Sequence, residues 1–150
     1  MKAFLVASVL LMLVHFETYY AKVIGIHDGD SITVLNESNK QIKIRLDGID
    51  CPELKQDFGT KARQYTSALC FNKQVIIKKT GTDRYGRTLA LVYVGRLCLN
   101  TELVRVGLAW HYKKYNREEI YSKFEKHARL NRIGLWSQNN PIPPWEFRRK

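Results

Sequence analysis

The sequence predicts an α+β fold, namely a small five-stranded β-barrel that carries about three helices. Short segments in which polar and apolar residues alternate, typical of half-buried strands, occur before residue 47 and again between residues 74 and 94. A segment with apolar residues at helical spacing, residues 60–70, separates the two groups. A chain of 150 residues with no internal repeat and no linker-like segment is expected to fold as one domain.

The first three strands are expected to form a meander. They span residues 21–28, 31–35 and 41–46. The tight turn Asp28–Asp30 joins the first two strands, and Gly29 would give that turn a positive φ. The hairpin therefore places Asp30 at the start of the second strand, near the end of the third.

The second half of the chain adds two strands and two helices. Strands are expected at residues 74–79 and 88–94, followed by a short return at Leu97–Leu99. Asn100 would cap a helix that ends at Gly107, and a last helix would span residues 118–130. The tail 141–150 is expected to be extended and basic. Three strands, a helix and two more strands fit a closed OB-type barrel with helices on its outside.

Residues 3–14 form a short apolar run behind Met1-Lys2. This is the layout of a signal peptide, and the run is shorter than the roughly 20 residues of a spanning helix. We expect residues 1–21 to be a signal peptide, with Ala21 as a candidate for the cleavage site, and residues 22–150 to form an exported domain, periplasmic or extracellular. The main alternative is an uncleaved membrane anchor through residues 3–14.

The charge balance points to a polyanionic partner. The chain has 25 Lys and Arg against 14 Asp and Glu, a formal net charge of +11. Such an excess favours binding to nucleic acid first and to an anionic membrane surface second. Three cysteines and four histidines show neither zinc-site spacing nor an HNH-like pattern, and whether Cys70 and Cys98 form a disulfide is left open.

The stretch from Ile44 to Glu53 carries the strongest functional signal. Alternation along the third strand turns Arg45 away from the core, and Gly48 and Pro52 constrain the loop that holds Asp50 and Glu53. Asp30 and Asp50, with a backbone carbonyl, would form a hard-oxygen site that suits Ca²⁺, although the residues alone do not exclude Mg²⁺ or Mn²⁺.

A second segment, Asp83-Arg-Tyr-Gly-Arg87, adds two guanidinium groups and a phenol on one turn. Hydrolysis of a phosphodiester requires a positioned water and neutralisation of the charge that grows on the phosphoryl oxygens. Glu53 would act as the general base, and Arg45 and Arg87 would hold the phosphate from two sides. On its own the pentapeptide could equally be an ordinary solvated turn.

Three motifs in this order, Asp28–Ser31, Ile44–Glu53 and Asp83–Arg87, resemble those of the staphylococcal nuclease (thermonuclease) family, from about Val23 to Trp136. The resemblance implies an OB barrel with three helices and a secreted, Ca²⁺-dependent enzyme that cuts DNA and RNA and leaves 3′-phosphate ends. It also implies metal ligation by the three groups Asp30, Asp50 and the carbonyl of Cys51, and catalysis by Arg45, Glu53 and Arg87.

The resemblance further implies a set of substrate-binding residues. Arg84 and Tyr85 match positions that meet the terminal phosphate, and Tyr112 and Tyr115 lie where the family places two tyrosines around the nucleotide. We expect a monomer. The competing hypothesis is an OB module that binds nucleic acid without cleaving it; the retention of Asp30, Arg45, Asp50, Glu53 and Arg87 favours the enzyme.

Overall fold

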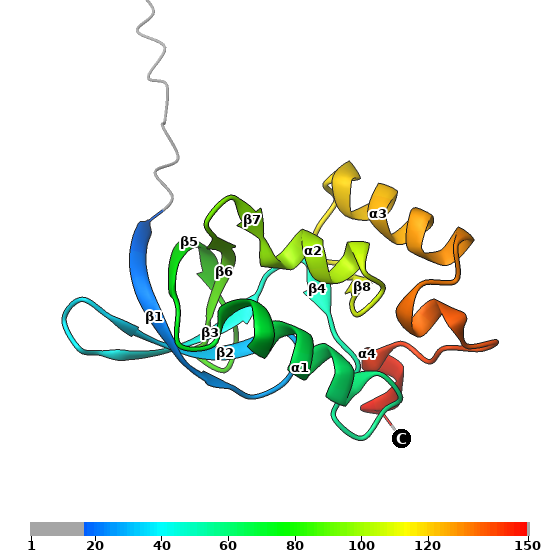
Figure 1. Ribbon diagram of the computed structural model, residues 1–150, viewed down its shortest axis with the longest axis horizontal. Helices are drawn as coiled ribbons and strands as arrows, with labels where there is room; N and C mark the ends of the chain where they lie inside the picture. Colours follow the sequence, from blue (N-terminus) through cyan, green and yellow to red (C-terminus); the bar gives the residue numbers. More distant parts are fainter. Residues whose placement is uncertain (1–16, 150) are drawn as a thin grey trace, which may run out of the picture.

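The computed structural model describes residues 17–149 and confirms a closed five-stranded barrel (Figure 1). Neighbouring strands pair antiparallel in the order β3, β2, β1, β5, β6, and a parallel pairing of β3 with β6 closes the barrel. The strands are β1 (Thr18–Ile26), β2 (Ser31–Asn36), β3 (Gln41–Leu46), β5 (Gln74–Thr82) and β6 (Thr88–Val94).

Alternation decides which side chains of these strands form the core. In β3, Ile44 and Leu46 are fully buried inside the barrel, whereas Arg45 between them points to the other face. Ser31 of β2 pairs with Arg45 in the ladder. The barrel thus presents Arg45 and the start of β2 next to each other on its outside.

The helices lie outside the barrel, as Figure 1 shows. They are α1 (Gly59–Cys70), α2 (Leu99–Arg105), α3 (Glu119–Leu130), the 3-10 helix η1 (Gly134–Ser137) and the short α4 (Pro144–Phe147). Helix α2 packs against β6 and α3, while α4 lies near the loop that leads into α1. The expectation of about three helices therefore holds for the long ones, and two single-turn helices are added.

Three two-residue strands connect the barrel to this helical layer. Strand β7 (Leu97–Cys98) turns back and pairs antiparallel with β6, and β4 (Ile49–Asp50) pairs with β8 (Trp110–His111). In the second pair, Asp50 lies opposite Trp110. This pairing brings the loop after β3 beside the segment that carries Tyr112 and Tyr115.

Two local expectations are wrong. Gly29 is absent from the glycines with positive φ among the described residues, and its role is instead a close approach: a Cβ there would lie 2.7 Å from both Ala62 Cβ and Cys51 Sγ. Asn100 does not cap α2, which starts one residue earlier with Cys98 at the N-cap. Its side chain is fully buried and bonds the backbones of Asp47, Ala90 and Val92.

The two ends of the described chain also differ from expectation. β1 begins at Thr18, so four residues of the segment assigned to a leader pair with β5, and Ala21 is buried. The tail is not wholly extended, because Pro144 opens α4. Cys51, Cys70 and Cys98 are all free thiols. No helix within residues 17–149 is long and apolar enough to cross a membrane; the apolar run 3–14 lies outside the described residues.

Candidate active site

Asp30 is held at the hairpin turn by contacts with the loop after β4. The backbone amide of Cys51 donates a 2.6 Å hydrogen bond to Asp30 Oδ2, and the backbone amide of Leu46 donates to the Asp30 carbonyl at 2.8 Å. Thr66 of α1 donates to the Gly29 carbonyl at 2.6 Å. The turn, the end of β3 and α1 therefore fix the Asp30 carboxylate, which is 4% exposed.

Arg45 joins Asp30 to Asp50. Its Nη1 lies 3.2 Å from Asp30 Oδ2, and its Nη2 lies 2.9 Å from Asp50 Oδ1. Nη1 also donates to the carbonyls of Leu46 and Ile49 at 2.9 and 3.0 Å. Burial would lower the pKa of Arg45, but the two carboxylates outweigh burial and raise it. One guanidinium thus gathers both proposed carboxylate ligands.

The two carboxylates carry more negative charge than Arg45 can balance. Burial raises the pKa of Asp30 well above its usual range, and the neighbouring Asp28 and Asp50 add to this, whereas Arg45 opposes it. A cation near Asp30 and Asp50 would relieve the cost of a buried carboxylate. The donor chemistry, two hard oxygen groups with an excess of negative charge, therefore fits a divalent ion such as Ca²⁺.

The site differs from an all-protein metal cage. Within residues 17–149, no group of three or more His, Cys, Asp or Glu side chains is arranged to hold a metal ion. A metal at Asp30 and Asp50 would thus need further oxygen ligands, of which the Cys51 carbonyl is the one that the resemblance implies. The buried His111 is engaged elsewhere, with Asn116 and Ser122.

Glu53 lies on the loop that follows Asp50. Gln56 fixes the backbone of Glu53 through two hydrogen bonds. The Glu53 backbone amide donates to the side-chain oxygen of Gln56 at 2.9 Å, and the Gln56 backbone amide donates to the Glu53 carbonyl at 2.8 Å. The close approach of Gly59, where a Cβ would lie 1.9 Å from the Glu53 carbonyl oxygen, adds to this restraint. The side chain of Glu53 pairs with Arg148 at 2.7 Å.

Arg148 is a site residue that sequence reasoning missed. Besides Glu53, it contacts both oxygens of Asp50, with Nη2–Oδ2 at 2.8 Å and Nη1–Oδ1 at 3.2 Å. It lies 98 residues after Asp50 in a basic tail, where nothing in the local pattern separates it from Arg149 and Lys150.

Arg87 reaches the same site from the β5–β6 turn. Asp83 accepts from Arg87 Nε at 2.7 Å, and Arg87 Nη1 donates to Ser31 Oγ at 3.4 Å. Ser31 in turn donates to Asp30 Oδ1 at 3.3 Å. The structure thus brings Arg87 to the edge of the group formed by Asp30, Arg45 and Asp50, as the sequence predicted.

Arg84 and Tyr85 form the outer rim of this turn. Tyr85 is 69% exposed, and its hydroxyl is 2.6 Å from Arg84 Nη2. The Arg87 guanidinium carbon lies 5.7 Å from the centre of the Tyr85 ring. An exposed phenol ring next to a guanidinium can stack on a base while the arginine binds a phosphate.

Tyr112 and Tyr115 meet at a second rim, after β8. Their ring centres are 4.8 Å apart in an edge-to-face arrangement. Tyr115 is 64% exposed, whereas Tyr112 stacks face to face on Trp145 at 5.0 Å. Tyr115 is therefore open to a ligand on this rim, while one face of Tyr112 is covered by α4.

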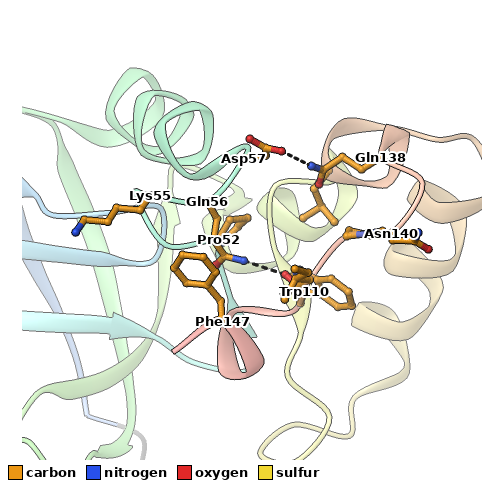
Figure 2. A pocket seen from close by; sticks show the side chains of 11 residues that line it. Pro52, Lys55, Gln56, Asp57, Trp110, Gln138, Asn140 and Phe147 are labelled. Carbon is orange, nitrogen blue, oxygen red and sulfur yellow. Dashed lines mark hydrogen bonds between the residues drawn. The ribbon is translucent and has the colours of Figure 1, made fainter. Parts of the chain in front are cut away.

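A pocket of about 280 Å³ lies beside the Glu53 loop, between that loop and the C-terminal segment (Figure 2). Gln56 Nε2 donates to the Ile142 carbonyl at 3.0 Å, and Gln138 Nε2 donates to Asp57 Oδ2 at 2.8 Å. Figure 2 shows Phe147 of α4 next to Gln56 and Pro52. These contacts hold the C-terminal segment across the loop that carries Glu53.

Comparison with protein families identifies the family of this chain. Residues 43–138 match the family model described as staphylococcal nuclease homologue. The chain belongs to the staphylococcal nuclease family. The match covers the segments that carry Arg45, Asp50, Glu53 and Arg87.

Curated relatives of this nuclease family span bacteria and plants. A Haemophilus influenzae protein described as an uncharacterized endonuclease is 45% identical over 129 residues. The aligned part covers 86% of this chain and 72% of the Haemophilus protein. The Shigella flexneri micrococcal nuclease is 40% identical, over 87% of this chain and 81% of its own. The Arabidopsis thaliana staphylococcal-like nuclease CAN1 is 36% identical, over 73% of this chain and 34% of its own.

Proposed function

We propose that this member of the staphylococcal nuclease family is a Ca²⁺-dependent phosphodiesterase that cleaves DNA and RNA with low sequence specificity and leaves 3′-phosphate ends. The observation that carries the proposal is the convergence of Asp30 and Asp50 on one partly buried guanidinium, that of Arg45. Arg87 adjoins this group through Ser31, and Glu53 adjoins it through the short loop after Asp50.

Asp30, Asp50 and the Cys51 carbonyl would hold the Ca²⁺. When bound, the ion would supply positive charge to the scissile phosphate and a place for the attacking water. The exclusion of water around Asp30 and Asp50, which are 4% and 1% exposed, strengthens electrostatic interactions at this point.

The arginines of the site would bind and stabilise the phosphoryl group. Arg45 is rigid, because its guanidinium also donates to two backbone carbonyls. Arg87 is oriented by Asp83 and remains partly exposed. Two guanidinium groups from different sides suit the charge that grows on the phosphoryl oxygens when water attacks.

Glu53 would accept a proton from the attacking water. A new bond would form between the water oxygen and phosphorus while the bond from phosphorus to the 5′ oxygen breaks. The 5′ oxygen would take up a proton from solvent and leave as a hydroxyl, so the phosphate would stay on the 3′ side. The Glu53 side chain is 35% exposed and extends from a constrained loop. Its carboxylate can therefore reach a water at the edge of the site.

Low sequence specificity is supported by the kinds of residue on the two rims. Tyr85 and Tyr115 offer exposed ring faces, on which every base can stack. The net charge of +11 would attract the phosphate backbone of either nucleic acid. We also propose that the protein is a monomer, which its molar mass in solution would test. We further propose that it is exported through a signal around the apolar run 3–14, ahead of the start of β1 at Thr18, which a search for the protein outside the cytoplasm would test.

Replacement of Glu53 or Arg87 separates the enzyme from a module that only binds. We expect Glu53→Ala and Arg87→Ala to lower the turnover of single-stranded DNA by about 10²- to 10⁴-fold. Glu37→Ala and Arg96→Ala, which change exposed residues of the same charge on distant turns, should leave turnover unchanged. Both catalytic variants should still melt cooperatively and bind a non-cleavable oligonucleotide.

The proposal fails if the wild-type protein binds DNA tightly and cleaves neither DNA nor RNA with any divalent ion. A non-catalytic OB module would then be the correct description. Unchanged turnover in Glu53→Ala alone would reject the general-base role and keep the nuclease.

A further inference from the structure

The C-terminal arginine Arg148 occupies the solvent side of the candidate metal site. Its guanidinium faces Asp50 with both terminal nitrogens, at 2.8 and 3.2 Å, and holds Glu53 Oε1 at 2.7 Å. Asp50 is 2% exposed in its side chain, and Arg148 is 44% exposed. A planar guanidinium that faces both carboxylate oxygens is the strongest type of side-chain ion pair.

Asp50 is thereby enclosed between two arginines. Arg45, whose side chain is 13% exposed, contacts Oδ1 from the buried side, and Arg148 contacts both oxygens from the solvent side. A metal ion that enters from solvent needs lone pairs on that outer side of Asp50. Arg148 already uses them, so the ion and Arg148 cannot bind Asp50 in the same way at the same time.

The charges of the site lead to the same conclusion. Asp30, Asp50 and Glu53 bring three negative charges, and Arg45 and Arg148 bring two positive charges to them. Arg148 therefore supplies, without any ion, part of the positive charge that a divalent cation would supply.

The segment that carries Arg148 is seated by contacts of its own. Trp145 stacks on Tyr112 at 5.0 Å with an angle of 5° between the rings, and it meets Trp110 edge to face at 5.5 Å. The hydrogen bond from Gln56 to Ile142, seen in Figure 2, ties the same segment to the Glu53 loop. The position of Arg148 thus follows from the packing of α4 and is not that of a free tail.

We propose that Arg148 is an internal counter-cation of the active site that competes with the metal ion for the Asp50 carboxylate and must be displaced when the ion binds. The inference rests on the proposed Ca²⁺-dependent function. Displacement also frees the Glu53 carboxylate oxygen that accepts a hydrogen bond from Arg148. Arg148 accordingly sets the metal concentration at which the site becomes active.

Calcium binding measured by titration calorimetry tests this without any assay of activity. We compare the protein with Arg148→Gln and with Arg149→Gln, a matched control that removes the same charge from the adjacent exposed residue. If the Arg148 side chain occupies the site in most molecules, only the small free fraction can bind Ca²⁺, and the apparent affinity for Ca²⁺ falls in proportion to that fraction. We therefore expect Arg148→Gln to bind Ca²⁺ about tenfold more tightly than Arg149→Gln does. Arg148→Lys, which keeps the charge and loses the planar fork, should fall between them.

Hydrogen exchange of the peptide 141–150 provides the second measurement. Saturating Ca²⁺ should speed exchange of the Arg148 and Arg149 amides, which donate to the Pro144 and Glu146 carbonyls, in the wild-type protein. In Arg148→Gln the same amides should exchange fast with or without Ca²⁺.

Three results would overturn the inference. Equal Ca²⁺ affinity in Arg148→Gln and Arg149→Gln would show that Arg148 does not compete, and weaker binding in Arg148→Gln would show that it assists the metal; both leave the proposed function intact. Absence of Ca²⁺ binding in every variant would instead remove the proposed Ca²⁺ function, and this inference with it.

Discussion

The amide of Cys51 and the carboxylate of Asp30, 21 residues apart, are joined by a hydrogen bond of 2.6 Å. The bond ties the β1–β2 turn to the loop after β4, and it sets the two carboxylates of the site around Arg45. This long-range hydrogen bond is therefore one of the contacts that place Asp30 beside Asp50.

Asp30→Asn should separate metal binding from folding. An asparagine oxygen can still accept from the Cys51 amide. The negative charge whose burial is unfavourable, and for which burial raises the pKa of Asp30, is gone. We expect the free energy of unfolding in a chelator to stay within about 1 kcal/mol of the wild type or to rise. We expect the stabilisation by Ca²⁺, about 2.7 kcal/mol at 100 times Kd, to disappear. Thermal melts with and without Ca²⁺ measure both, and an equal Ca²⁺ shift in the variant would contradict ligation by Asp30.

Asp83→Asn should loosen Arg87 while it preserves the turn. An asparagine oxygen can make the Asp83 Oδ1 bonds to the Tyr85 and Arg87 amides. The 2.7 Å bond from Arg87 Nε is lost, because the asparagine NH₂ in place of Oδ2 cannot accept it. A misplaced phosphate-binding group lowers kcat, here by about tenfold. Steady-state kinetics on single-stranded DNA, with Glu37→Gln as the control, would show it; a kcat equal to that of the control would mean that Asp83 does not orient Arg87.

The same carboxylate defines a pH dependence. Burial would raise the pKa of Asp83, but hydrogen bonds from the Arg87 backbone and guanidinium outweigh it and lower the pKa below 3.8. Because the pKa is lower in the folded protein, the ionised Asp83 stabilises the fold at any pH above its ordinary pKa. The fold loses this stabilisation as the pH falls through the lowered pKa. The stability difference between wild type and Asp83→Asn should therefore be constant from neutral pH to about pH 5 and shrink below about pH 4. Urea denaturation of both proteins across this pH range measures the difference. A difference in the free energy of unfolding that stays constant down to about pH 3 would contradict a stabilising pair between Asp83 and Arg87.

Asn100→Ala should be strongly destabilising. The buried Asn100 side chain accepts from the Val92 amide at 3.1 Å and donates to the Asp47 and Ala90 carbonyls at 2.9 and 3.0 Å. Loss of one partner of a buried hydrogen bond costs about 1–3 kcal/mol, and here three backbone groups lose theirs. We expect a loss of at least about 3 kcal/mol in chemical denaturation. A change under 1 kcal/mol would indicate that water replaces the amide.

The barrel could be predicted from sequence because its signals are local. The bounds expected for β3 and β6 are those observed, since alternation and glycine-containing turns act within a few residues. The hairpin turn at Asp28–Asp30 and the loop that holds Asp50 also predicted that four residues lie close together, namely Asp30, Arg45, Asp50 and Arg87. These residues sit at strand ends, where short-range geometry limits the possible positions.

Asn100 and Arg148 show what local patterns cannot supply. An asparagine before a helix has the signature of an N-cap, and only the fold shows that β6 and the end of β3 lie within reach of its side chain. Arg148 is indistinguishable from its basic neighbours until α4 is placed beside the Glu53 loop. Both are contacts across more than one element, and a single sequence carries no record of such pairs.

The start of β1 predicts where the folded domain begins. A chain that starts at residue 22 loses the pairs Thr18–Lys78, Tyr19–Ile77, Tyr20–Ile76 and Ala21–Val75. The buried Ala21 and the partly buried Tyr19, which packs on the core, are lost with them. We expect a version from residue 17 to be more stable than one from residue 22 by at least about 2 kcal/mol, from the apolar area removed. Equal melting of the two would show that this end of β1 contributes little.

Thiol reactivity should distinguish the three cysteines. Burial raises the pKa of Cys51 and raises that of Cys70 to about 12, and both side chains are enclosed in the core. Cys98 is partly exposed. One thiol per molecule should therefore react quickly with a disulfide reagent in native protein at pH 8, and three should react after unfolding. Cys98→Ser should abolish the fast reaction, and fast labelling that persists in this variant would contradict the burial of the other two.

Cleavage of a labelled single-stranded DNA by the protein, with Ca²⁺, with Mg²⁺ and with a chelator, tests the central claim most directly. The proposed site predicts cleavage with Ca²⁺ that the chelator abolishes, products with 3′-phosphate ends, and cleavage by Glu53→Ala that is slower by about 10²- to 10⁴-fold under the same conditions. Binding of the DNA without cleavage under all three conditions would contradict the claim, and cleavage that persists in the chelator would contradict the role given to Asp30 and Asp50.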